Sequence, residues 1–242
     1  MWKLIYKFGS PKYFFNISSK FLPYLKIMSL CLLAVGSLWG LFFVPPDYLQ
    51  GDAFRIIYIH VPAAFTSLSL YSFMGMLAII LLIWRIKIAG IILFQAAEIG
   101  AAMTFIALIT GSIWGKPMWG TWWIWDARLT SELILLLFYL AILAVKNAYK
   151  NKDNGEKIVA ILTLVGLIDL PIIHYSVVWW NTLHQGSTIS FFAKPKIELV
   201  MAYPLFIMII GFIFYSFLLI IIKSRNELLI RERNQSWVSS VL

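Results

Sequence analysis

The stretch WGKPMWGTWWIWDAR, residues 114–128, lies between two apolar runs that are each long enough to cross a bilayer. It holds five of the eleven tryptophans in the chain. Tryptophan is common where a helix meets lipid headgroups, but a belt of this kind does not need such density. Four residues recur at helical spacing: Trp119, Trp122, Trp123 and Asp126. A helix through them presents three indoles and a carboxylate on one face, which suits a large flat ligand.

The composition around this stretch is that of an integral membrane protein. Of 242 residues, 61% are hydrophobic, 17% are aromatic and 13% are charged, whereas soluble domains have about 25% charged residues. Spans of about 20 apolar residues predict an all-α fold with six transmembrane helices. The predicted spans are 24–44, 61–84, 91–113, 129–145, 158–178 and 199–222. We therefore expect a single polytopic membrane domain over residues 1–242, with residues 114–128 as an outer loop.

The basic residues predict the orientation of these spans. Of 20 Lys and Arg, 15 fall in the N-terminal segment, two alternate loops and the tail at 223–242, and five fall in the other three loops. Cytoplasmic loops carry the excess of positive charge, so both termini should be cytoplasmic. The net charge of +9 is thus explained by topology and does not indicate a nucleic-acid partner. Loops 45–60, 114–128 and 179–198 should share the outer side.

Several chemistries lack the residues that they need. The single cysteine, Cys31, lies inside the first predicted span, which excludes an intramolecular disulfide and a CxxCH heme attachment motif. Any heme would be bound non-covalently. The chain has no Gly-rich phosphate loop, HExxH or GxSxG pattern, so an energy source would have to lie in another protein.

Histidines occur at three places, and two of them lie in the outer loops on either side of the tryptophan stretch. His60 precedes Pro62 at the start of the second span, and His184 lies in the third outer loop. His174, inside the fifth span, is a rival to His184. A lone interfacial histidine would be unremarkable, but imidazole is a common axial ligand of heme iron and indoles stack on a porphyrin. Because the lone pair of neutral imidazole is needed, such binding should weaken in acid.

Charged residues near these histidines have two interpretations. Asp126 either caps the fourth span or has a functional role, in which it hydrogen-bonds an axial histidine or fixes the loop. Basic residues on the outer side suit heme propionates or lipid phosphates: Arg55, Arg128, Lys194 and Lys196. Within the spans, Glu98, Asp169 and His174 are expected to make structural pairs, although intramembrane ionisable groups are also candidates for functional sites.

Three sequence blocks resemble one family, the cytochrome c maturation protein C branch of the heme-handling proteins, also called heme exporter protein C. Its tryptophan-rich WWD motif corresponds to WGKPMWGTWWIWDARLTSELIL, its first histidine region to YIHVPAAF and its third-loop region to PIIHYSVVWWNTLHQGST. The blocks occur in order between Ile57 and Gly186. Phe65 stands where tryptophan is expected in the first block, which keeps an aromatic ring at that position.

The resemblance implies a function and a set of partners. Heme b would bind transiently at the outer face of the bacterial inner membrane, with His60 and His184 as axial ligands. The platform would be formed by Trp114, Trp119, Trp122, Trp123, Trp125, Asp126 and Arg128. The heme would then pass to a periplasmic heme chaperone, maturation protein E, during c-type cytochrome biogenesis. The implied partners are the small membrane protein D and the A and B subunits of an ATP-binding cassette transporter. The chain itself would not be an enzyme.

Two other classes of function remain open from the residues alone. In a permease, heme would cross the bilayer through the six spans, but these spans offer few polar groups to line a path for a dianionic porphyrin. In a protein that binds glycans or lipid-linked sugars, a tryptophan face beside a carboxylate would hold sugar rings. The outer loops contain Asp47, Asp52, Asp126 and Glu198, so their composition permits the acids that sugar chemistry uses.

Overall fold

The computed structural model describes residues 9–148, 152–180, 182–184 and 197–240, and its long elements are all helices. In chain order they are α2 (Pro11–Leu38), η1 (Trp39–Phe43), η2 (Asp52–Ile56), α3 (Ile57–Trp84), α4 (Lys87–Trp119), α5 (Ala127–Ala148), α6 (Lys152–Gly166), α7 (Asp169–Trp179), α8 (Leu199–Arg231) and α9 (Ser236–Ser239). Six helical segments are long and apolar enough to cross a membrane, which confirms the predicted number of spans.

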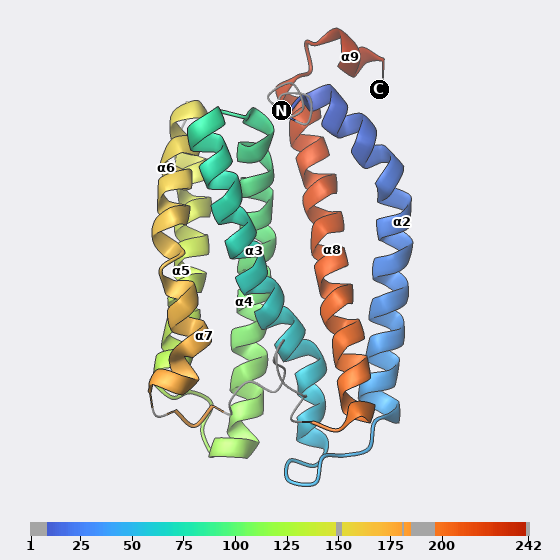
Figure 1. Ribbon diagram of the computed structural model, residues 1–242, viewed down its shortest axis with the longest axis vertical. Helices are drawn as coiled ribbons and strands as arrows, with labels where there is room; N and C mark the ends of the chain where they lie inside the picture. Colours follow the sequence, from blue (N-terminus) through green and yellow to red (C-terminus); the bar gives the residue numbers. More distant parts are fainter. Residues whose placement is uncertain (1–8, 149–151, 181, 185–196, 241–242) are drawn as a thin grey trace.

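The helices form two groups that meet along α3 and α4 (Figure 1). One group is the antiparallel pair of α2 and α8, and the other contains α3 to α7. The end of the molecule where α2 begins and α8 stops is called the terminal end below. The opposite end, where α4 stops and α5 begins, is called the tryptophan end. Here α3 leans across from its own group and packs against α8.

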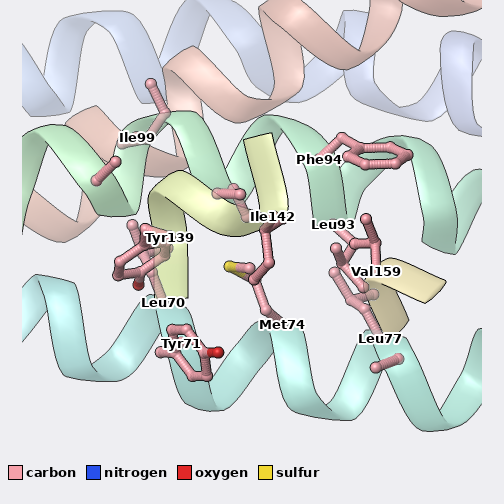
Figure 2. Close-up of a cluster of buried hydrophobic side chains, with 14 of the residues drawn as sticks. Leu70, Tyr71, Met74, Leu77, Leu93, Phe94, Ile99, Tyr139, Ile142 and Val159 are labelled. Carbon is pink, nitrogen blue, oxygen red and sulfur yellow. The ribbon is translucent and has the colours of Figure 1, made fainter. Parts of the chain in front are cut away.

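The largest buried cluster fixes α3, α4, α5 and α6 against one another (Figure 2). Leu70 and Met74 of α3, Leu93 of α4 and Ile142 of α5 are among its members, and each is less than a twentieth exposed. Because protein interiors pack at nearly crystalline density, such a cluster holds the helices at fixed distances. The candidate site described below is therefore built on a rigid four-helix scaffold.

The helix α4 is longer than the predicted span, and this changes the tryptophan stretch. Residues 114–119, expected in the outer loop, form the last turns of α4. The helix stops at Gly120, whose φ of 77° lies in the left-handed region that only glycine adopts without strain. The prediction of one helical face through Trp119, Trp122, Trp123 and Asp126 is therefore wrong, because Gly120 ends the helix between Trp119 and the other three.

The fifth predicted span, 158–178, is not one continuous helix. It is divided into α6 and α7 by a turn at Leu167 and Ile168. Pro171 explains the break, since proline has no N–H to donate to the carbonyl of Leu167 and its ring clashes with that carbonyl. Asp169 follows the break as the first residue of α7.

The last span also continues beyond its predicted end at residue 222. Charged side chains in its final turns have partners on other helices, which lets the helix extend to Arg231. Lys223 pairs with Glu98 at 2.6 Å, and Arg231 pairs with Glu156 at 2.6 Å. Part of the tail expected from residue 223 is therefore helix, and α8 joins the two helix groups near the terminal end.

Candidate functional site

A cavity of about 290 Å³ opens among α3, α4, α5 and residues 183–184 at the tryptophan end. Its wall contains most of the residues that the sequence singled out: His60, His184, Trp114, Trp119, Trp123 and Arg128. These residues come from separate parts of the chain, so the cavity is made by the fold and not by one loop. Its lining is mostly apolar with a few polar groups, which is the usual character of a ligand site.

His60 lies in the first turn of α3, near the helix N-terminus as predicted. Its Nδ1 is 3.0 Å from the carbonyl oxygen of Ala107 and 3.2 Å from Oγ1 of Thr110 on α4. A carbonyl oxygen can only accept a hydrogen bond, so Nδ1 carries the proton of the neutral ring. The lone pair is then on Nε2. Bonds of this kind orient histidines that ligate metals in proteins.

The ring centres of His60 and His184 are 6.4 Å apart, and the ring planes are inclined by 38°. A metal bound by two imidazoles lies about 2 Å from each ligating nitrogen, and each nitrogen is roughly 1 Å from its ring centre, so paired ring centres are about 6 Å apart. The observed separation thus fits one iron atom between the two rings. The structure brings this predicted pair together.

Three of the five tryptophans in the stretch line the cavity, and two do not. The ring of Trp114 is 5.7 Å from that of His60 and nearly perpendicular to it, whereas the ring of Trp119 is 6.1 Å from that of His184. Trp123 completes this aromatic wall. In contrast, Trp122 and Trp125 are 56% and 76% exposed and lie outside the cavity wall.

Asp126 has both of the roles that the sequence left open, capping α5 and fixing a loop. Its Oδ1 accepts a hydrogen bond of 2.8 Å from the backbone N–H of Leu129, as an N-cap residue does. Its Oδ2 accepts a hydrogen bond from the hydroxyl of Thr182. The same hydroxyl accepts the backbone N–H of His184 at 3.1 Å. By way of the Thr182 hydroxyl, Asp126 therefore holds the backbone of His184 in place.

Arg128 is the cation that lines the cavity among the described residues. Its Nη1 donates a hydrogen bond of 3.2 Å to the carbonyl oxygen of Ile173 on α7, and this bond fixes the guanidinium beside the cavity. Arg55, a second predicted candidate, forms an ion pair within the first loop and is absent from the cavity wall. The other two candidates, Lys194 and Lys196, lie outside the described residues.

The three intramembrane ionisable groups have different environments. Glu98 pairs with Lys223, which confirms a structural pair. For Asp169 the expected pair is not found among the described residues: the side chain is buried and its Oδ2 has no hydrogen-bond partner there. His174 is exposed on α7, beside Tyr175, and does not line the cavity. The geometry therefore does not support it as a rival to His184.

Three residues of the site carried no clear signal in the sequence. Gln50, in the first loop, accepts a 2.8 Å hydrogen bond from Nε1 of Trp114 and so joins that loop to the last turns of α4, 64 residues away. Thr182 connects Asp126 with His184. Glu132, near the start of α5, is buried and lines the cavity. Each role depends on a contact between distant segments, which local sequence patterns do not reveal.

Known proteins resemble this chain along its whole length. The sequence profile of the family described as Heme exporter protein C matches residues 4–239. The Heme exporter protein C of Escherichia coli (strain K12) is 47% identical over 242 residues, covering 100% of this chain and 98% of the relative. That of Haemophilus influenzae is 45% identical over 241 residues, again covering 100% and 98%. The chain belongs to the Heme exporter protein C family.

A more distant member of the Heme exporter protein C family comes from Bradyrhizobium diazoefficiens. It is 42% identical over 223 residues, covering 92% of this chain and 84% of the relative. The range matched by the family profile includes every residue of the cavity wall. The family name describes handling of heme and not catalysis, which agrees with the lack of familiar hydrolase and nucleotide motifs in the sequence.

Proposed function

We propose that this chain binds heme in the cavity at the tryptophan end, with the iron held between His60 and His184. The separation of the two rings, 6.4 Å, is the observation that carries the proposal. Additional support comes from His60, whose Nδ1 hydrogen bond leaves Nε2 as the ligating atom. Heme would be cargo, bound non-covalently and transiently, because the single cysteine is not part of an attachment motif.

The tryptophans and Arg128 would supply the rest of the binding energy. Indole rings beside each histidine offer apolar surface to the porphyrin, and burial of aromatic surface is strongly favourable. Arg128 would bind a heme propionate, since a guanidinium forms strong charge-assisted hydrogen bonds with carboxylates. Of the two sequence interpretations of the cations, the position of Arg128 in the cavity wall favours propionate binding over lipid phosphate at this residue.

The biological setting follows from the orientation that the basic residues predict. The tryptophan end would face the periplasm of a bacterial inner membrane, and both termini would be cytoplasmic. Heme would pass from this site to the periplasmic chaperone, maturation protein E, during c-type cytochrome assembly. Maturation protein D and the transporter subunits A and B would be membrane partners. These two subunits would supply the ATP-driven step, for which this chain has no motif.

Visible absorption spectra of the detergent-purified protein, oxidised and reduced after heme addition, test this function. The wild type should give a low-spin bis-histidine spectrum. His60→Ala and His184→Ala should each lose this spectrum, because each removes an axial ligand. His174→Ala is the matched control and should leave the spectrum unchanged, since His174 is exposed and lies away from the cavity.

Two results would contradict the assignment. If His60→Ala or His184→Ala kept the wild-type heme content and spectrum, the proposed ligands would be wrong. If the wild type bound no heme even in excess, the protein alone would not be the heme receptor.

A further inference from the structure

The wall of the cavity contains a carboxyl group that heme binding, as proposed above, does not use. Glu132 lies on α5 and is only 9% exposed. Its Oε1 is fully buried and has no hydrogen-bond partner among the described residues. A buried carboxyl without partners is costly, so its presence in a ligand cavity requires an explanation.

Among the charged groups around Glu132, Arg128 acts on it most strongly and Asp169 acts second. The two residues are four positions apart on α5, so their side chains project from the same side of the helix. Both line the cavity, and each contributes to the electrostatic environment of the other. The described contacts include no direct ion pair between them, and the bond that anchors the guanidinium goes to Ile173 instead. Arg128 thus has donors left to bind an anion.

We propose that Glu132 competes with a heme propionate for Arg128 and thereby limits how tightly the cavity holds heme. This inference rests on the proposed function. Glu132 supplies negative charge to the partly buried guanidinium of Arg128. When a propionate binds Arg128, it brings a second carboxylate close to Glu132, and the repulsion between like charges weakens binding. The repulsion between Glu132 and the propionate would favour release of heme, which a site that passes its heme to another protein needs.

Equilibrium heme binding to the full-length protein in detergent tests the proposal, with two ligands. Heme carries two propionates, and heme dimethyl ester has the same iron and ring without the negative charges. Glu132→Gln should bind heme on the order of tenfold more tightly, because the amide keeps the shape and removes the competing charge. Its affinity for the ester should equal that of the wild type.

Two further variants connect the effect to Arg128. Arg128→Gln should weaken heme binding and leave ester binding unchanged. In the double variant, the gain from Glu132→Gln should disappear, since without Arg128 there is nothing to compete for; a double-mutant cycle measures this coupling. Glu98→Gln is the matched control, a carboxyl-to-amide change in a span away from the cavity, and should bind both ligands as the wild type does.

The proposal is overturned if Glu132→Gln binds heme equally or more weakly, or if it strengthens ester binding to the same extent. It is also overturned if the gain persists in the Arg128→Gln background, which would indicate general repulsion by Glu132. Glu132→Met, uncharged and of similar volume, repeats the test if the amide variant is unstable. A wild type that binds neither ligand would instead contradict the proposed function, so the two failures are distinguishable.

Discussion

At the scale of single residues, the position of His184 depends on one hydroxyl group. His184 lies after α7 in a segment that is not helical, so helical hydrogen bonds do not hold it. The hydroxyl of Thr182 donates to Asp126 and accepts the backbone N–H of His184 at 3.1 Å. It therefore links the cap of α5 to the backbone of a candidate ligand. A ligand on a loop needs such support, because a free loop would lose conformational entropy on binding the metal.

Thr182→Val removes this hydroxyl and keeps the branched shape of the side chain. We expect heme affinity to fall on the order of tenfold, which is typical when a residue that orients a metal ligand is lost. Thr182→Ser keeps the hydroxyl and should bind heme like the wild type. Heme titration followed at the Soret band measures both variants. Equal affinity for the valine and serine variants would show that the hydroxyl does not position His184.

At the scale of helices, α4 and α5 approach closely because of Gly100. A Cβ atom at this position would lie 2.3 Å from ring atoms of Tyr139 on α5. The Tyr139 ring has little freedom to move, since its hydroxyl donates a 2.8 Å hydrogen bond to the carbonyl of Ser67 on α3. Its ring also meets that of Tyr71 at 5.0 Å between centres (Figure 2). Three helices thus converge on one glycine.

Gly100→Ala should destabilise the bundle by roughly 1–3 kcal/mol, the usual cost of overpacking a core. The higher helix propensity of alanine would offset part of this cost. Thermal unfolding in detergent, followed by circular dichroism, measures the change. Ala102→Leu adds more volume on the exposed face of the same helix and should leave the melting temperature nearly unchanged. A glycine variant as stable as the wild type would mean that Tyr139 can be displaced at little cost.

The six long helical segments could be predicted from the sequence, whereas the ends of the helices and the breaks within them were harder to place. Six apolar runs predict six helices because each must satisfy its backbone groups inside a bilayer. The extension of α4 to Trp119 was missed because Trp114, Lys116 and Pro117 resemble a loop by composition. The break before α7 does have a local cause in Pro171, so it was predictable in principle.

The candidate site was predictable to the extent that its residues have special chemistry. His60, His184 and Arg128 were selected because imidazole and guanidinium groups suit iron and propionates, and the fold brings them to one cavity. Trp122 and Trp125 were selected by the same pattern as their neighbours, yet they are exposed. The spacing of the tryptophans in the sequence could not distinguish these two from the ones that line the cavity, because the turn after Gly120 decides which indoles face inward.

At the scale of the whole molecule, the two ends differ in charge and in structure. The described basic residues near the terminal end include those of the α3–α4 turn and the last turns of α8. The tryptophan end has Arg55, Lys116 and Arg128 and also contains the cavity. If the terminal end is cytoplasmic, as positive charge predicts, then the cavity faces the compartment where a periplasmic chaperone would collect heme. The proposed function therefore depends on this orientation.

Single-cysteine labelling tests the orientation directly. In a Cys31→Ser background, Leu49→Cys places a thiol at the tryptophan end, where Leu49 is 86% exposed, and Asn234→Cys places one on the exposed segment after α8. A maleimide that cannot cross membranes should label the Leu49 variant in intact spheroplasts. It should label the Asn234 variant only after lysis, which also serves as the control that this thiol is reactive. The reverse pattern would place the cavity on the cytoplasmic side, and direct delivery of heme to a periplasmic chaperone would then be impossible.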